Sequence, residues 1–214
     1  MWEFAPAARS GAYRSGDPFT ELRAYLGRHP HNATVVAMES AAFRRGLAQH
    51  PPARDVVAAG PEVRRDGALG TYRLVTVDLG SRASTAVDAV PAHTVEALLV
   101  SMAVKPGGYR DWPNVGLWLT QACAEVASGA GEEPGTAESA VGVEGMIELL
   151  QGMPVAAWAR AAYLLRQGHQ HDASLVLLAA APGRPTGPVY LGPRTGARVY
   201  DAPTGVYDSL LANP

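Results

Sequence analysis

The spacing of apolar residues changes near residue 91, and this change divides the chain into two parts. Before it, short β-branched runs alternate with amphipathic stretches, whereas after it apolar positions recur mainly at helical spacing. The pattern predicts a mixed α/β (α+β) fold. A mixed sheet with flanking helices is expected over residues 1–90, and a mainly helical part with short C-terminal strands over residues 91–214, the two forming one continuous domain.

In the first part, β-branched and alternating runs predict strands and helical spacing predicts two helices. Strands are expected at residues 2–4, 33–38, 54–59 and 71–79, and helices at 19–30 and 39–49. On the second helix Ala42, Phe43 and Leu47 form an apolar stripe. This stripe places Arg44 and Arg45 toward solvent.

The second part begins with a helix over residues 93–104, which Lys105-Pro106-Gly107-Gly108 ends. The next stretch, "YRDWPN", is predicted to begin a helix, because Asp111 can cap it and Pro113 suits its first turn. One apolar stripe then follows at Val115, Trp118, Leu119, Ala122 and Val126.

Further helices are expected at residues 139–152 and 153–168, separated from the previous helix by the linker-like "GAGEEPGTAES". Asp172 is expected to cap a last helix over residues 173–183, which is apolar nearly all round and is therefore predicted to be buried. The tail, residues 187–205, predicts two short strands around a turn.

Composition is that of an ordinary globular protein: 214 residues, 47% apolar and 18% charged. No run is long enough for a membrane span, and the first residues lack the basic and apolar regions of a signal peptide. The single cysteine, Cys123, cannot form an internal disulfide. These features favour a cytoplasmic protein without membrane contact.

The net charge of −2 conceals an asymmetry. Residues 1–83 have a net charge of +3, and residues 84–214 a net charge of −5. No Lys or Arg lies between Arg110 and Arg160, where seven acids fall: Asp111, Glu125, Glu132, Glu133, Glu138, Glu144 and Glu148. Such a region should repel nucleic acid; it is either a solvated helical face or a surface for a basic protein partner.

Catalytic signatures are missing from the sequence. Neither a Gly-x-Ser-x-Gly elbow nor a phosphate-binding loop is present, and His169 and His171 lack a third metal ligand with its own local pattern. Glu39, Asp78 and Asp88 lie near predicted strand ends, so a nuclease-like, phosphate-handling enzyme with a site assembled from distant residues stays an alternative. No catalytic residue, metal or cofactor is expected.

Several segments, in order along the chain, resemble antitoxins of the AbiEi family, the AbiEi-like transcriptional regulators of type IV toxin–antitoxin systems, in the actinobacterial style. They are "WEFAPAARSGAYRSGDPFTELRAYL", "VVAMESAAFRRGLA", "VEALLVSMAVKPGGYRDWPNVGLWL", "ARAAYLLRQG" and "GRPTGPVYLGP". The resemblance implies a non-enzymatic regulator that counteracts a co-encoded nucleotidyltransferase-like toxin and represses its own operon.

One departure from the family concerns DNA. Such proteins carry an N-terminal winged helix-turn-helix that binds DNA, and almost nothing precedes Trp2 here. Operator binding is therefore expected only if a winged helix-turn-helix is supplied. Residual nucleic-acid affinity should then be weak and sequence-independent, through Arg44, Arg45, Arg64 and Arg65. The toxin is expected to meet the acidic residues Glu132, Glu133, Glu138, Glu144 and Glu148. The oligomeric state stays open.

Overall fold

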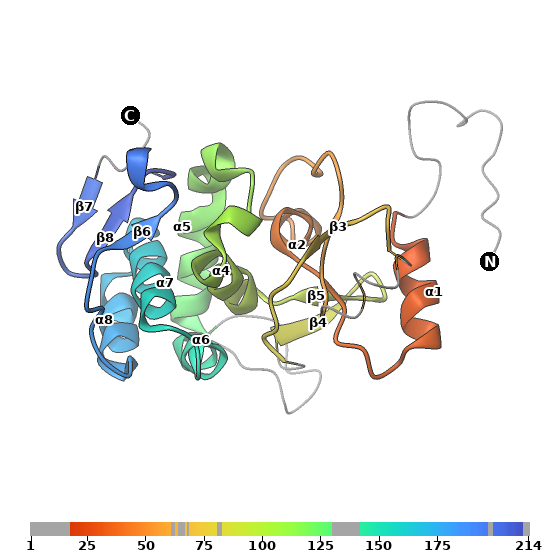
Figure 1. Cartoon of the computed structure of the whole chain (residues 1–214), viewed down its shortest axis with the longest axis horizontal. Coiled ribbons are helices and arrows are strands. Elements are labelled where there is room, and N and C mark those ends of the chain that lie inside the picture. Colours follow the sequence, from red (N-terminus) through yellow and green to blue (C-terminus); the bar gives the residue numbers. More distant parts are fainter. Residues whose placement is uncertain are drawn as a thin grey trace.

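A computed structural model describes residues 18–60, 63, 67, 69–80, 83–129, 142–196 and 199–211. It confirms the predicted mixed α/β class: a five-stranded sheet, a group of helices and a second, three-stranded sheet follow one another along the long axis of the molecule (Figure 1). The strand expected at residues 2–4 lies outside the described residues.

The five-stranded sheet combines parallel and antiparallel pairs in the order β3-β2-β1-β5-β4. β1 pairs with β5 and β2 with β3 in parallel, whereas β1–β2 and β4–β5 are antiparallel. Its strands are β1 (Val35–Val36), β2 (Val56–Ala58), β3 (Arg73–Val75), β4 (Ser84–Val87) and β5 (Val90–His93). The first three fall within the predicted strands.

The hairpin β4–β5 was not predicted. Pro91 argues against a strand from sequence, yet it sits in β5 opposite Ala86. The turn between the strands uses Asp88 and Ala89 at φ 48° and 60°. Two successive residues with positive φ match a type I′ hairpin turn, but Ala is an unusual residue for it, which hides the turn from sequence.

Both faces of this sheet are covered. On β2, Val57 belongs to the cluster formed with α1 (Thr20–Arg28), which includes Phe19 and Leu22. Its neighbours Val56 and Ala58 belong to the cluster shared with α2 (Met38–Arg44) and the later helices. The two-residue alternation of a strand thus sends successive side chains into two different cores.

The helix α4 (Val95–Val104) is the centre of the larger core. Nine of its ten residues are buried, because it packs against α2 on one side and against α5 (Trp112–Ser128), α6 (Gly142–Leu150) and α7 (Val155–Gln167) on the others. Thr94 caps it, accepting a hydrogen bond from the Ala97 amide at 3.2 Å. The predicted helix over residues 93–104 is therefore buried on nearly every side.

The remaining helices extend this bundle, and a small sheet closes its far end (Figure 1). α7 contacts both α8 and the small sheet, whose order is β6-β8-β7. The tail thus forms three strands rather than two. The elements are α5 (Trp112–Ser128), α6 (Gly142–Leu150), α7 (Val155–Gln167), α8 (His171–Ala180), β6 (Val189–Leu191), β7 (Val199–Asp201) and β8 (Val206–Asp208), with one-turn 3-10 helices η3 (Pro106–Gly108) and η4 (Arg194–Gly196).

The prediction that the last helix is buried was wrong. α8 buries Ala173, Ser174 and Leu177, but Leu175 and Val176 are 55% and 48% exposed. The helix packs on α6 and α7 along one side only. The other side presents large apolar groups to solvent. Asp172 lies in its first turn, and the N-cap position belongs to Gln170.

None of the helices in the described part of the chain has the length and apolar character that a bilayer crossing requires.

Candidate functional site

A polar pocket of ≈ 460 Å³ lies where α2, the loop that follows it and the start of α5 meet. It brings together Glu39 and the "YRDWPN" segment, although Glu39 and Arg110 lie 71 residues apart in the sequence. The pocket is lined by Glu39, Ala48, His50, Pro51, Pro52, Ala53, Arg54, Arg73, Arg110, Asp111 and Asn114.

Glu39 is committed to internal contacts. Its carboxylate accepts hydrogen bonds from the Arg73 guanidinium and from the backbone amide of Arg110. Arg73 also donates to the carbonyl of Gly108 at 2.5 Å. Both side chains are largely buried, 7% and 13% exposed, and burial lowers the pKa of Arg73 against the opposing attraction of Glu39. Glu39 thus joins α2 and β3 to the loop before α5.

The "YRDWPN" segment is a helix start, as predicted, although its cap differs from the expectation. Asp111 is the N-cap residue, but its carboxylate accepts from the Asn114 side chain at 2.7 Å and caps no helix amide. Trp112 donates through its indole nitrogen to the Pro106 carbonyl at 3.1 Å. Tyr109 is buried beside Trp112 and Trp118, and burial raises the pKa of its hydroxyl.

The other carboxylates considered for catalysis lie elsewhere. Asp78 accepts from the Gly80 amide at 3.0 Å, in a turn. The Asp88 side chain is 74% exposed and pairs with Arg44. No group of three or more His, Cys, Asp or Glu able to hold a metal occurs among the described residues, and His169 and His171 are both exposed.

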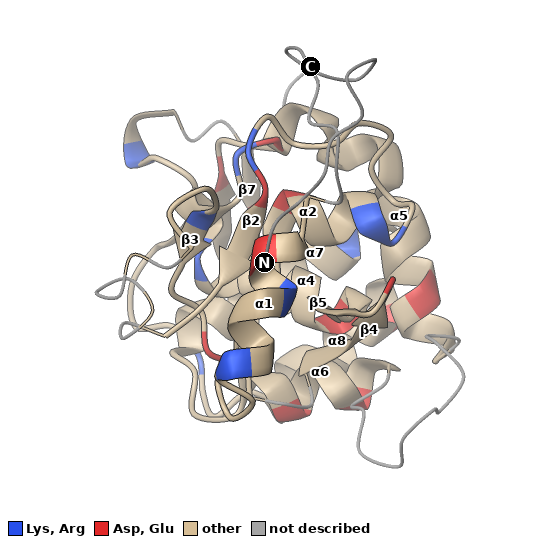
Figure 2. Cartoon of the chain, turned by 90° about the vertical axis from the view of Figure 1, so that its right-hand side faces the viewer, with Lys and Arg blue, Asp and Glu red and all other residues tan. Residues whose placement is uncertain are grey.

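The expectation that Arg44 faces solvent was wrong. Only 12% of its side chain is exposed, its guanidinium lies 2.8 Å from the Asp88 carboxylate, and its charge sits 4.6 Å from the centre of the Phe19 ring. On the face that α1 occupies, basic and acidic residues are interspersed (Figure 2). Phe43, expected in the apolar stripe, is instead 37% exposed.

Arg45 is likewise turned inward. Its guanidinium donates to the carbonyl of His93, to the hydroxyl of Thr85 at 2.7 Å and to the carbonyl of Ala92 at 3.3 Å. It therefore fastens α2 to the β4–β5 hairpin. Arg44 and Arg45 as nucleic-acid contacts stay a prediction, and Arg64 and Arg65 lie outside the described residues.

His93, at the end of β5, makes stability depend on pH. It is 1% exposed, and burial, with the neighbouring Arg45 charge, lowers its pKa from 6.5 to about 4. Below pH 6.5 His93 is protonated in the unfolded chain, whereas in the folded chain it stays neutral until the pH falls toward 4. Stability from this group is therefore present above pH 6.5 and is lost as pH falls toward 4.

Between pH 7 and pH 5 we expect His93 to reduce the free energy of unfolding by about 2 kcal/mol. Urea unfolding of the parent and of His93→Gln at both pH values measures this loss as the difference between their pH dependences. Equal pH dependence in the two proteins would show that His93 is protonated as readily when folded as when unfolded.

Of the acidic residues expected to meet a partner, Glu144 and Glu148 are described. Both are exposed, one helical turn apart on α6. Glu132, Glu133 and Glu138 lie outside the described residues. Glu96 is different: it is buried and accepts from the Gly142 amide at 2.9 Å, which fixes the start of α6 against α4.

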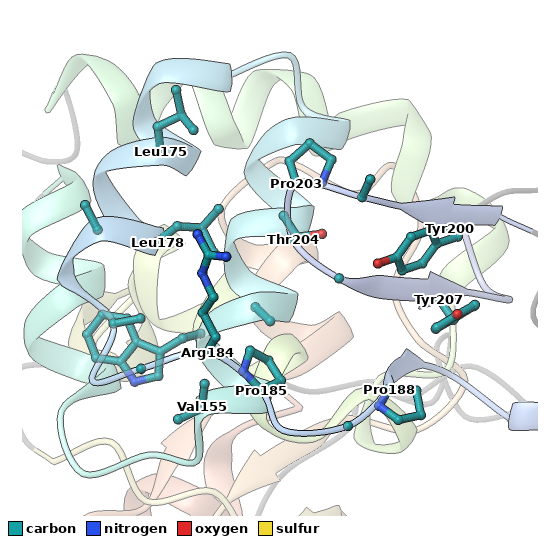
Figure 3. Close-up of a pocket in the computed structure, with 18 residues that line it drawn as sticks. Val155, Leu175, Leu178, Arg184, Pro185, Pro188, Tyr200, Pro203, Thr204 and Tyr207 are labelled. Carbon is teal, nitrogen blue, oxygen red and sulfur yellow. The ribbon is translucent and has the colours of Figure 1, made fainter.

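A second hollow, not predicted from sequence, is a groove of ≈ 820 Å³ between α8 and the small sheet (Figure 3). Leu175 and Leu178 of α8 form one wall, and Pro203 and Thr204 of the β7–β8 turn form the other. Trp158 of α7 also lines the groove, and the loop at residues 183–188 contributes Pro185 and Pro188 to the lining.

The small sheet adds a row of aromatic side chains. Tyr190, Tyr207 and Tyr200 occupy paired positions on its three strands, with ring centres 5.4 and 4.6 Å apart. Their neighbours Val189, Leu191 and Val206 point the other way and are buried. The signal for this row is the repeated Val-Tyr pair at residues 189–190, 199–200 and 206–207, which places each Tyr on the outer face.

Comparison with known proteins gives a structural relative. No protein-family model and no curated protein matches the chain. The crystal structure of the RV2827C protein from Mycobacterium tuberculosis superposes with a TM-score of 0.73 at 25% identity, covering 92% of this chain and 69% of that one. This likeness supports the fold, and the name of that protein states no activity.

Proposed function

We propose that this domain is a non-enzymatic antitoxin domain of a type IV toxin–antitoxin system, which counteracts a co-encoded nucleotidyltransferase-like toxin. With a winged helix-turn-helix supplied, it would also repress its own operon. The proposal combines the resemblance to AbiEi-family antitoxins with a surface suited to binding another protein.

The observation that carries the proposal is the distribution of exposed apolar side chains. Of the seven large apolar residues exposed in the described part of the chain, five lie on α8 and the small sheet: Leu175, Val176, Val199, Tyr200 and Tyr207. Three of them, Leu175, Tyr200 and Tyr207, line one groove. Proteins seldom expose apolar residues together unless the surface binds something. This end of the molecule is therefore the best candidate for a protein interface.

The contacts of the carboxylates near strand ends argue against catalysis in the polar pocket. Glu39 would be its natural general base, but both oxygens already accept donors from Arg73 and Arg110. Asp78 and Asp88 have separate partners, Gly80 and Arg44. An enzyme needs its acid, base and binding groups within reach of one reacting atom.

Two of the segments that resemble the family meet in this fold. The side chain of Met38, from "VVAMESAAFRRGLA", packs so closely on Gly108 that a Cβ there would lie 2.9 Å from the Met38 methyl carbon. Glu39 accepts the amide of Arg110 from the second segment. Residues of these two segments are thus in direct contact with each other.

The charges of Glu144 and Glu148 offer a contact for a toxin with a basic phosphate-binding cleft. Complementary charge speeds association and has less effect on affinity. Both residues are exposed on α6, which packs against α8, so the acidic residues lie on an element next to the apolar end.

Co-expression with a nucleotidyltransferase-like toxin encoded beside this chain, where such a gene is present, tests the function. We expect restored growth of toxin-expressing cells and co-purification of the two proteins. Failure of both, with a folded chain judged by circular dichroism, would refute the antitoxin role.

The contact surface needs a separate test within the same system. Glu144→Lys combined with Glu148→Lys should slow association roughly tenfold at low salt and weaken protection. The size-matched pair Glu144→Gln and Glu148→Gln should give a smaller effect. Protection equal to that of the parent with the Lys pair would place the contact elsewhere.

A further inference from the structure

The groove between α8 and the small sheet is open rather than enclosed. Leu175 on one wall and Tyr200 on the other are 55% and 54% exposed, whereas Trp158 is only 3% exposed. A buried small molecule would need walls on nearly all sides, because such sites cover most of the ligand surface. An open groove suits a segment of chain that enters at one end and leaves at the other.

The lining of the groove suits contacts with the side chains of a ligand more than with its backbone. It is lined by aromatic and aliphatic groups and by three prolines, Pro185, Pro188 and Pro203. A ligand inside it must present apolar side chains in an extended conformation.

One charge lies in the groove. Arg184 is exposed, and its side chain extends along the groove toward Leu178 (Figure 3). No Asp or Glu is among the lining residues, and no ion pair of Arg184 occurs within the described part of the chain. A carboxylate on the ligand would therefore meet a cation that has no competing acid beside it.

A hydrogen-bond donor at the base of the groove also lacks an acceptor. The indole nitrogen of Trp158 is buried and has no partner among the described residues. Proteins seldom leave such a group unpaired. A backbone carbonyl of a bound chain that reached this nitrogen would satisfy it.

From these features we infer that the groove is a binding site for an extended, proline-containing peptide segment of a partner protein, with an acidic side chain placed against Arg184. Proline holds a chain in the polyproline II conformation, in which every backbone carbonyl is free to accept a hydrogen bond. Aromatic grooves bind such segments well because the rigid chain loses little conformational entropy.

Single-stranded nucleic acid fits less well. Its binding sites follow the phosphates with a row of basic residues, whereas Arg184 is the single Lys or Arg among the described residues that line this groove. Residues 84–214, which build the groove, have a net charge of −5. The inference concerns the chemistry of the ligand chain and stands apart from the proposed function, since it does not require that the toxin supplies the segment.

An array of octapeptides tests the inference on the full chain. Each peptide holds two prolines three residues apart and one flanking glutamate, with the other positions varied; matched arrays replace both prolines by glycine or the glutamate by lysine. We expect binding to the proline–glutamate array, and a dissociation constant of roughly 100 µM or below for its best member by fluorescence anisotropy. Equal binding to all three arrays, no binding to any, or a stronger signal with an oligothymidine of eight nucleotides would overturn it.

Variants locate the site. Tyr200→Ala should weaken the best peptide at least about tenfold, while Leu117→Ala, which removes a 74% exposed leucine on α5 outside the groove, should leave it unchanged. Arg184→Glu should weaken the glutamate peptide about tenfold and strengthen its lysine counterpart. Unchanged binding in Tyr200→Ala, or the same response of both peptides to Arg184→Glu, would contradict the assignment.

Discussion

Replacing Glu39 with alanine is expected to lower the free energy of unfolding by about 3–5 kcal/mol. The loss comes from Arg73, because removing its partner leaves a guanidinium that is 13% exposed without a compensating charge. The backbone amide of Arg110 loses its acceptor as well. Urea unfolding of Glu39→Ala against the parent measures the effect.

The double variant Glu39→Met and Arg73→Met is the control that separates charge from packing. Buried ion pairs replaced together by apolar groups often cost little, since the desolvation of both charges is also avoided. We expect the double variant to be more stable than Glu39→Ala, although the carbonyl of Gly108 loses a donor. A loss below about 1 kcal/mol in Glu39→Ala would mean that water replaces the carboxylate at no penalty.

Gly168→Ala is expected to destabilise the protein by about 3 kcal/mol, at the upper end of the range for overpacking. Gly168 follows α7 where that helix meets α5, and a Cβ there would lie 2.4 Å from the Cβ and 2.5 Å from the sulfur of Cys123. The short cysteine side chain cannot turn away, and the Leu119 carbonyl at 3.2 Å limits movement of the backbone. Thermal and urea unfolding measure the change.

Gly116→Ala provides the matched control. Gly116 lies on the exposed side of α5 with nothing within 4 Å of an added Cβ, so alanine there should stabilise the protein by about 0.5–1 kcal/mol through better helix propensity. Adding Cys123→Gly to Gly168→Ala should recover part of the loss. If Gly168→Ala and Gly116→Ala behave alike, the contact between α5 and α7 is looser than the structure indicates.

The polar pocket and the groove differ in how their polar groups are paired, and this difference indicates which of them binds a partner. In the polar pocket Glu39 and Arg73 are paired with each other, and their contacts hold α2, β3 and the start of α5 in place. The groove has the opposite character: an unpaired donor at Trp158, a cation at Arg184 without an acid, and exposed aromatic walls. A binding role is therefore better sought at the C-terminal end.

The sequence by itself determined the helices and the three strands whose signals are local. The stripe of Val115, Trp118 and Leu119 is buried as predicted, because residues one helical turn apart share a face whatever the helix packs against. Local signals did not predict the β4–β5 hairpin, because Pro91 lies in a strand and Ala89 in a turn position that these residue types disfavour. Tertiary pairing outweighed these preferences.

Only the tertiary structure decided which polar groups meet and which apolar surfaces stay open. Glu39 lies 34 residues from Arg73 and 71 from Arg110 along the chain, so no spacing rule joins them. Arg44 and Arg45 look solvent-facing on a helix in isolation, yet the β4–β5 hairpin surrounds them. The apolar run of α8 predicts burial on every side, but α6 and α7 cover one side of it, and the exposure of Leu175 depends on where those neighbours end.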